Sequence, residues 1–174
     1  MPGDIKLKYA STVTMTVTNL HSLAASQALT AGWSSASVAN TTNLYLDYLV
    51  SGTFTTAATS RQVGSIEVWA MGSLTDTPTW PALATGTAGT QGTASFTAVE
   101  QKNSYCRLLT AFNVNTTASQ IYAFPPTSIA QLFGGQAPTH WALFVTGNAT
   151  TTTAAQFAAS GSAIYYTPVL AQYT

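Results

Sequence analysis

Residues 5 to 17 alternate between apolar and polar side chains. The apolar ones occupy odd positions and the polar ones even positions, and only Ala10 and Ser11 interrupt the pattern. A period of two places successive side chains on opposite faces of an extended strand, so this segment is predicted to be a half-buried β-strand. The same alternation recurs as far as the C-terminal residues, which indicates an all-β protein.

The alternation and the turn residues between its runs predict one domain over residues 1–174 with about eight to ten strands. We expect an antiparallel β-sandwich, jelly-roll-like, with one short helix over residues 127–133 that ends at Gly134. Residues 72–92 are expected to form a long loop, and Pro125 is expected to end a strand. The strongest strand segments are 5–17, 44–54, 65–71, 93–99, 105–114, 120–124, 140–146 and 163–173.

The chain carries very little charge. Only 6% of its 174 residues are charged, with five basic and five acidic side chains and a net charge of zero. Nucleic acid is therefore not an expected partner, because binding phosphates requires clustered Lys and Arg. No apolar run approaches the length of a membrane span, and no signal peptide is recognised, so synthesis in the cytoplasm is expected. A surface this weakly charged favours self-association.

No residue pattern indicates catalysis, a cofactor or a metal site. The two histidines, His21 and His140, lie in no diagnostic motif, and a structural role is expected for both. Asp47 and Glu67 lie on predicted strands and could face each other across a sheet, but solvation or pairing with Arg is the simpler interpretation. The single cysteine, Cys106, is expected to be a small buried apolar residue. The chain is predicted not to be an enzyme.

The aromatic residues suggest one function, which is the binding of a carbohydrate or a receptor. Trp69 and Trp141 lie within predicted strands, where packing in the core is the expected role. Trp80 lies in the predicted long loop and is the best candidate for an exposed ring. A loop tryptophan more often holds its own loop in place or contacts a neighbouring protein.

Several segments resemble small structural proteins of tailed bacteriophages. They are residues 3–9, residues 40–50, Phe133-Gly134-Gly135, residues 138–144 and Tyr165-Tyr166. The resemblance implies a virion component, of the auxiliary type that decorates or cements the head shell. By the same analogy its expected partners are the major capsid protein and copies of itself, in trimers. It implies no catalytic residue. The expected location is the capsid surface.

Two sets of residues follow from these interpretations. The predicted core consists of Ile5, Leu7, Val13, Met15, Val17, Leu46, Tyr48, Val50, Ile66, Val68, Leu108, Phe144 and Val145. The candidate interface comprises an N-terminal arm and the apolar residues of the long loop, namely Ile5, Lys6, Lys8, Leu74, Trp80, Pro81 and Leu83. A short arm that precedes a strand could pair with the edge of a partner's sheet.

Overall fold

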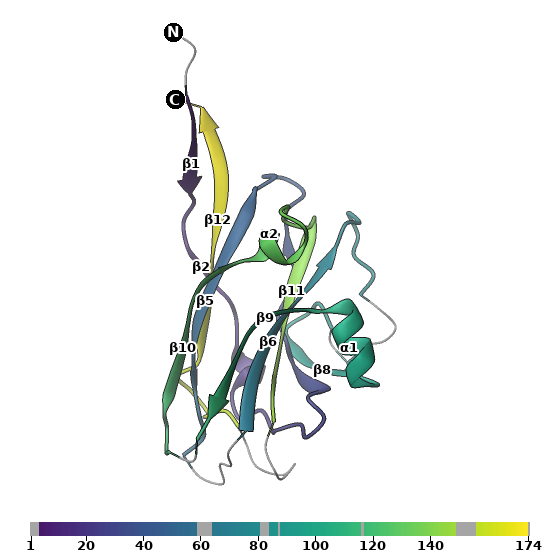
Figure 1. The fold of residues 1–174 in the computed structure, drawn as a ribbon, viewed down its shortest axis with the longest axis vertical. Coiled ribbons are helices and arrows are strands. Elements are labelled where there is room, and N and C mark those ends of the chain that lie inside the picture. Colours follow the sequence, from purple (N-terminus) through teal and green to yellow (C-terminus); the bar gives the residue numbers. More distant parts are fainter. Residues whose placement is uncertain are drawn as a thin grey trace.

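Two antiparallel sheets face each other in the computed structural model (Figure 1). The structure describes residues 4–58, 64–80, 84–86, 88–115, 117–148 and 156–173. In the five-stranded sheet the order is β1 (Ile5–Tyr9), β12 (Ala163–Tyr173), β5 (Asp47–Thr55) and β10 (Ile121–Ser128), and β2 (Val13–Thr14) also pairs with β12. In the seven-stranded sheet the order is β7 (Ala84–Gly86), β8 (Gly92–Phe96), β3 (Ala31–Ser34), β11 (His140–Gly147), β6 (Gly64–Ser73) and β9 (Arg107–Val114), and β4 (Val38–Ala39) also pairs with β11.

The strand order is that of a jelly roll, as predicted. We count β1 with β2 as the first strand and β3 with β4 as the second; β5, β6, β9, β10, β11 and β12 then follow as strands three to eight. On this count the two sheets have the orders 1-8-3-6 and 2-7-4-5, which is the double Greek-key arrangement. The β7–β8 hairpin is an insertion between the fourth and fifth strands that extends the seven-stranded sheet beside β3.

The main core lies between the two sheets. Alternate residues of β6 and β11 point into it, among them Val68 and Leu143, which are fully buried. Tyr48 of β5 packs against Trp141, with 5.2 Å between their ring centroids. A short 3-10 helix, η1 (Thr18–Leu20), adds the fully buried Leu20. Because every second residue of these strands is apolar, the alternation in the sequence is sufficient to predict this layer.

A second apolar layer covers the outer face of the seven-stranded sheet. It contains Met71, Phe96, Cys106 and Phe144, and it is covered by the β7–β8 hairpin and by α1 (Val99–Tyr105). Figure 1 shows α1 and β8 on this side of the sheet. All eight residues of β11 are therefore buried, which explains how the neighbouring Phe144 and Val145 can both be core residues although they point to opposite faces.

Three elements differ from the sequence-based expectation. The helix α1 was not predicted: the predicted strands over residues 93–99 and 105–114 reached only its two ends, and residues 100–104 were assigned to no element. β10 continues through Pro125 and Pro126, where the prediction ended it; a register shift between Phe124 and Thr127 accommodates the two prolines. The predicted long loop is interrupted by β7.

The predicted short helix is confirmed. The helix α2 (Ile129–Leu132) is shorter than expected, and the backbone N–H of Gln131 donates to the Ser128 hydroxyl at its N-terminal end over 3.0 Å. Gly134, just beyond its C-terminal end, has a φ of +80°, a conformation that glycine adopts readily. None of the helices in the described part of the chain is long and apolar enough to cross a bilayer.

Seven of the predicted core residues are confirmed, one is half-buried and five are wrong. The buried ones are Met15, Tyr48, Val50, Ile66, Val68, Phe144 and Val145. Val17 is half-buried against the core. The exposed ones are Ile5 (75% exposed), Leu7 (72%), Val13 (40%), Leu46 (48%) and Leu108 (45%).

Leu46 and Val13 are exposed because of their places in the fold. Leu46 lies just before β5, and its backbone N–H donates to the carbonyl oxygen of Val169, the last residue of β12 that pairs with β5. Val13 belongs to the two-residue edge strand β2.

β-bulges explain the exposure of the other three residues. In the pairing of β6 with β9, Val68 of β6 lies opposite Thr110, and the next residue, Trp69, lies opposite Leu108. The strand β9 therefore has one extra residue at this point. That residue is Leu109, which enters the core in place of Leu108. The N-terminal strand has a similar irregularity, which moves Ile5 and Leu7 to the other face of the sheet.

Candidate assembly interface

The N-terminal segment forms two strands where one was predicted. Tyr9 lies opposite Val169, whereas Val13 lies opposite Tyr166. From Tyr9 to Val13 the N-terminal segment advances by four residues, whereas β12 advances by only three, from Val169 to Tyr166. The N-terminal segment therefore has one extra residue, which falls at the Ala10–Ser11 interruption of the alternation. A shift of one residue exchanges the faces of a strand, so the apolar residues of β1 point away from the side on which Met15 enters the core.

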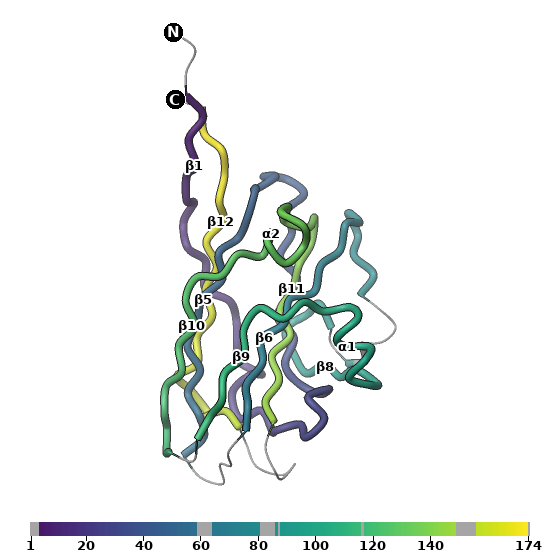
Figure 2. The backbone as a smooth tube through the Cα atoms, viewed as in Figure 1, coloured from purple at the N-terminus to yellow at the C-terminus, as the bar shows by residue number. Residues whose placement is uncertain are grey.

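β1 and the end of β12 form a two-stranded ribbon that projects from the sandwich. β12 pairs with β5 only as far as Val169, and from there to Tyr173 it pairs with β1 alone among the described strands. Figure 1 shows the ribbon extending beyond the rest of the molecule, and Figure 2 shows the start of β1 beside the end of β12 at its tip. We call residues 5–9 with 169–173 the ribbon. Neither outer edge of its projecting part is covered by another described strand.

The two faces of the ribbon differ in chemistry. Residues opposite each other in an antiparallel pair share a face. Ile5 faces Tyr173 and Leu7 faces Ala171, so these residues, together with Tyr9, form an apolar face. The opposite face carries Lys6 and Lys8, which lie across from Gln172 and Leu170.

The apolar face is open to solvent along its length. Ile5 is 75% exposed, Leu7 72%, Tyr9 65% and Tyr173 70%. An isolated two-stranded ribbon is at best marginally stable in water, and burial of its apolar face would stabilise it by roughly 25 cal/mol per Å². The ribbon therefore has the features of a surface that becomes covered in an assembly: an apolar face, two edges that pair with no other described strand and a projecting position.

Further apolar side chains lie near the base of the ribbon. Leu44 is 71% exposed, and Leu46, whose backbone N–H donates to Val169 O over 2.8 Å, is 48% exposed. The loop that holds them also contributes Tyr45 to a shallow hollow of about 430 Å³, whose other wall is formed by Lys8 and Leu170.

The structure places the predicted interface residues in two groups. Ile5, Lys6 and Lys8 lie on the ribbon, Ile5 on the apolar face and the lysines on the other. Leu74 follows β6 and is 85% exposed. Trp80 is half-buried, and its ring packs against Gly89 and the second apolar layer. Pro81 and Leu83 lie outside the described residues.

Sequence reasoning missed part of this surface. Leu7 was assigned to the core, and Tyr9, Ala171, Tyr173 and Leu44 were not proposed for the interface. The alternation at both ends of the chain was a usable signal, because two terminal strands of the same pattern can pair with each other. Their pairing beyond the sandwich depends on how far β5 extends, which the sequence pattern does not reveal.

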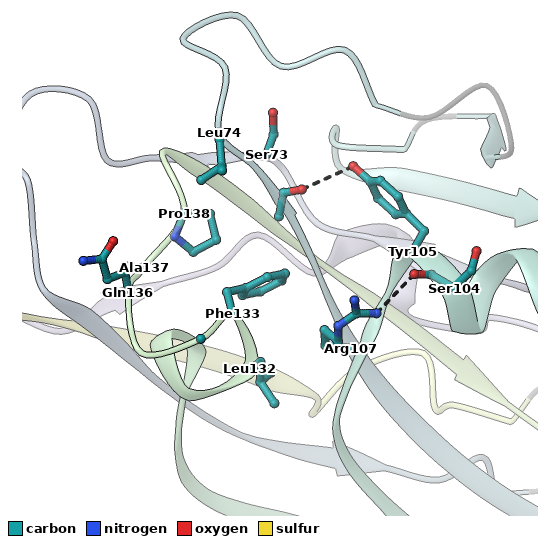
Figure 3. Close-up of a pocket in the computed structure, with 12 residues that line it drawn as sticks. Ser73, Leu74, Ser104, Tyr105, Arg107, Leu132, Phe133, Gln136, Ala137 and Pro138 are labelled. Carbon is teal, nitrogen blue, oxygen red and sulfur yellow. Dashed lines mark hydrogen bonds between the residues drawn. The ribbon is translucent and has the colours of Figure 1, made fainter.

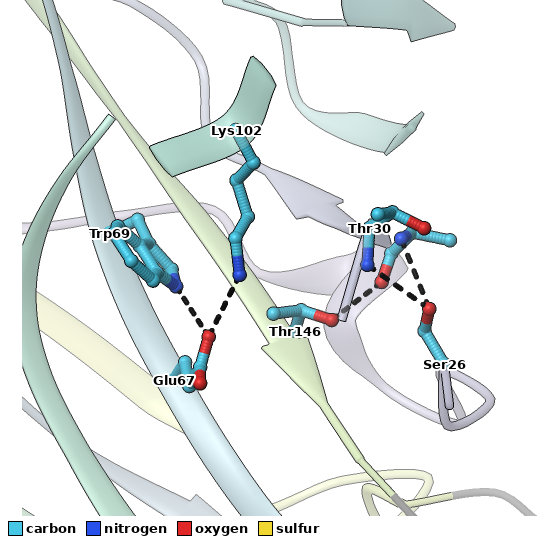
Figure 4. A network of polar contacts seen from close by, with 7 residues as sticks. Ser26, Thr30, Glu67, Trp69, Lys102 and Thr146 are labelled. Carbon is cyan, nitrogen blue, oxygen red and sulfur yellow. Dashed lines mark hydrogen bonds and ion pairs between the residues drawn. The ribbon is translucent and has the colours of Figure 1, made fainter. Parts of the chain in front are cut away.

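The candidate carboxylate pair does not form. Asp47 lies on β5 and Glu67 on β6, in different sheets, so they do not face each other across one sheet. Asp47 Oδ1 accepts the backbone N–H of Ala130 over 2.7 Å and so caps α2. Glu67 Oε2 accepts from Lys102 Nζ over 2.9 Å and from Trp69 Nε1 over 2.8 Å (Figure 4).

The Lys102–Glu67 contact holds α1 on the seven-stranded sheet. Lys102 is 1% exposed, and its ammonium lies 4.3 Å from the centroid of the Trp69 ring. It is the single ion pair found among the described residues. A buried charge is tolerated where a partner charge and further favourable contacts compensate for its lost hydration, and Glu67 and Trp69 fulfil that role here.

The other titratable groups considered for chemistry have structural contacts. His21 Nε2 lies 3.4 Å from Ser162 O, and His140 Nδ1 lies 3.1 Å from Thr75 O. Cys106 is 1% exposed, as predicted, and burial raises the pKa of its thiol to about 12. A search of the described residues finds no group of three or more His, Cys, Asp or Glu side chains arranged to hold a metal ion.

One hollow of about 660 Å³ lies apart from the ribbon, between the end of β6, the end of α1 and the loop that follows α2 (Figure 3). Its lining combines the aromatic side chains of Tyr105 and Phe133 with the cationic side chain of Arg107. No protein-family model, no curated protein and no solved structure matches this chain.

Proposed function

We propose that this chain is a non-enzymatic structural protein of a tailed-phage virion, and that it decorates the head shell by docking the ribbon onto the major capsid protein. The observation that carries the proposal is the apolar face of the ribbon, with Ile5, Leu7 and Tyr9 each at least 65% exposed. In this proposal the protein is made in the host cytoplasm and reaches the capsid surface by assembly.

The mode of docking follows from the backbone of the ribbon. The edges of the ribbon, which pair with no other described strand, can accept a strand of the partner by main-chain hydrogen bonds, while the apolar face rests on an apolar surface of the partner. Lys6 and Lys8 then remain on the side that faces solvent, where lysines also oppose uncontrolled edge-to-edge pairing. Each contact is small, and the multiple attachment of many copies to a lattice would strengthen it.

Two general properties support an assembly role. The jelly roll is a fold of viral capsid domains, although it also occurs in lectins, so the fold alone supports the proposal only by analogy. The chain carries 6% charged residues, which leaves little electrostatic repulsion between neighbouring copies. Contacts between copies of the chain around a three-fold axis of the shell are part of the same proposal.

Quantitative mass spectrometry of purified virions tests the proposal. A decoration protein is expected at a copy number comparable with that of the major capsid protein, and it should remain on heads separated from tails. Absence from purified particles would contradict the proposal. A few copies per particle that remain with the tails would instead favour the alternative function, a tail- or fibre-associated carbohydrate- or receptor-binding module.

A further inference from the structure

The guanidinium of Arg107 lies in the lining of the hollow of about 660 Å³ beside α1 and is held by two hydrogen bonds. Arg107 Nη1 donates to Ser104 O over 3.1 Å and to Cys106 O over 3.2 Å, and both acceptors belong to its own segment of chain. No described carboxylate forms an ion pair with it, because the ion pair found in the described part joins Lys102 and Glu67. The guanidinium carries five N–H donors, so donors on Nε and Nη2 remain for a ligand. Because these two hydrogen bonds already restrict the Arg107 side chain, it loses less conformational entropy when a ligand binds.

The opposite wall of the hollow is aromatic. Phe133 lies near the centre of Figure 3, between Pro138 and Arg107. A Cβ atom on Gly72 would lie 2.7 Å from Phe133 Cε1 and 2.9 Å from Pro138 Cγ, so the glycine allows the ring to approach β6 this closely. The Tyr105 hydroxyl donates to Gly72 O over 3.4 Å, which ties a second ring to the same strand. The apolar wall is therefore built by close packing.

Polar side chains complete the lining. Ser73, Ser104 and Gln136 also line the hollow. The Ser104 hydroxyl donates to Gln101 O over 2.9 Å and the Ser73 hydroxyl bonds to Thr75 Oγ1 over 2.9 Å, so each serine oxygen keeps acceptor capacity for a hydroxyl of a ligand. Gln136 is exposed, and its amide can both donate and accept hydrogen bonds. A volume of about 660 Å³ lies within the range of small-molecule sites, and the combination of an apolar wall with a few convergent polar groups is typical of them.

We propose that this hollow binds an acidic sugar, a hexose unit that carries a carboxylate. The carboxylate pairs with the free N–H donors of Arg107, which match its geometry. The C–H face of the sugar ring packs on the aromatic wall, and the sugar hydroxyls bond to the serine and glutamine side chains. The proposal is independent of the ribbon, because none of the residues that line the hollow belongs to it.

The ligand class follows from the lining as a whole. A purely apolar ligand would offer no acceptor to the remaining N–H donors of Arg107 and no partner to the amide of Gln136, at the cost of their hydration. A neutral sugar would use the aromatic wall and the hydroxyls but not the guanidinium. An acidic side chain of a peptide would use the guanidinium, but it offers few groups to the three polar side chains of the lining.

Titration of the ¹⁵N-labelled full chain with sodium glucuronate, followed by NMR, tests the proposal, with glucose as the neutral counterpart. We expect glucuronate to shift the backbone amides of residues 104–107 and 133–137 in a saturable manner, and glucose to bind at least about tenfold more weakly, because charged hydrogen bonds contribute about 1.5 kcal/mol or more. The Arg107→Gln variant should lose about tenfold in glucuronate affinity and keep its amide spectrum elsewhere. Lys8→Gln removes an equal charge on the ribbon and should leave the affinity unchanged.

Several outcomes would overturn the assignment. Equal binding of glucose and glucuronate would show that the carboxylate is not recognised. Shifts centred on the ribbon lysines, or no saturable shift, would show that the hollow is not the site. Tighter binding of N-acetylglutamate than of glucuronate would assign the hollow to an acidic peptide. Arg107→Lys keeps the charge without the planar fork, and an affinity equal to that of the parent protein would contradict pairing through the fork.

Discussion

The two halves of β12 have similar sequence patterns and opposite environments. From Ala163 to Val169 the strand lies against β5, and Ile164 is fully buried in the core. From Leu170 to Tyr173 it leaves the sandwich and pairs with β1, and Tyr173 is 70% exposed. Alternation thus predicts which residues share a face of a strand, but the rest of the fold decides whether that face is covered.

The same difference separates the sandwich from the ribbon. In the sandwich, every apolar face of β6 and β11 is covered by residues of the same chain, on one side by the five-stranded sheet and on the other by α1 and the β7–β8 hairpin. In the ribbon, the apolar face is not covered by the described residues. We therefore expect substitutions in the sandwich to affect stability and substitutions in the ribbon to affect binding.

The largest effect is expected for Val68→Asp. Val68 is fully buried between the sheets, and an aspartate there would place an unpaired charge in the core. We expect the free energy of unfolding to fall by about 4 kcal/mol or more, measured by urea denaturation. Val68→Ala, which leaves a cavity but no charge, should be milder. A loss below about 1 kcal/mol for the aspartate variant would mean that this position is not part of a packed core.

A somewhat smaller loss of stability is expected for Lys102→Met, which removes one partner of the buried ion pair. The carboxylate of Glu67 keeps its bond from Trp69 but loses its counter-charge. We expect a loss of about 3 kcal/mol in the free energy of unfolding, because a buried charge left without its partner is costly. The double variant with Glu67→Gln should recover part of that loss. Equal stability of the single and double variants would show that the two charges are not coupled.

At alkaline pH, the contribution of Cys106 to the free energy of unfolding is expected to decrease. Burial raises the pKa of its thiol from 9.0 to about 12, so the folded state disfavours the thiolate. The stabilisation is complete below pH 9 and is lost between pH 9 and about 12 as the unfolded chain ionises, by about 1.4 kcal/mol per pH unit. The difference in stability between the parent protein and Cys106→Ala should shrink over this range. A constant difference would contradict a buried, protonated thiol.

The smallest change in stability is expected for Leu7→Asp in the ribbon. Leu7 is 72% exposed, so its replacement removes little buried surface. We expect the free energy of unfolding to change by no more than about 0.5 kcal/mol, measured by urea denaturation. A loss of about 2 kcal/mol or more would mean that the ribbon packs against the sandwich in solution, and the contrast between the two regions would disappear.

The sequence predicts the core of the sandwich better than the bulge in β9 and the helix α1. Alternation was sufficient for Tyr48, Val50, Ile66 and Val68, because both sheets bury one face of each strand. It failed for Leu108, because a bulge is a local irregularity that a strict period of two cannot represent. The helix α1 was missed because Lys102 is buried by an ion pair with a residue 35 positions away, and no local pattern reports such a contact.

The candidate interface was predicted in part. The N-terminal arm was expected from its charged and apolar residues, and Ile5, Lys6 and Lys8 do lie in an exposed strand. The assignment of Leu7 to the core was wrong, because the alternation was treated as one continuous strand across Ala10. The bulge and the pairing with the C-terminal residues depend on contacts between the two ends of the chain. These contacts become visible only in the folded structure.

The most direct test of the ribbon as a docking element compares two variants on its two faces. Leu7→Asp alters the apolar face and Lys6→Asp the opposite face, and both place the same residue in the same exposed strand. Binding of each variant to purified head shells that lack the protein would be measured by co-sedimentation. We expect Leu7→Asp to lose at least about tenfold in affinity and Lys6→Asp to bind nearly as well as the parent protein, because only Leu7 is buried by docking. Full binding of Leu7→Asp would contradict the account.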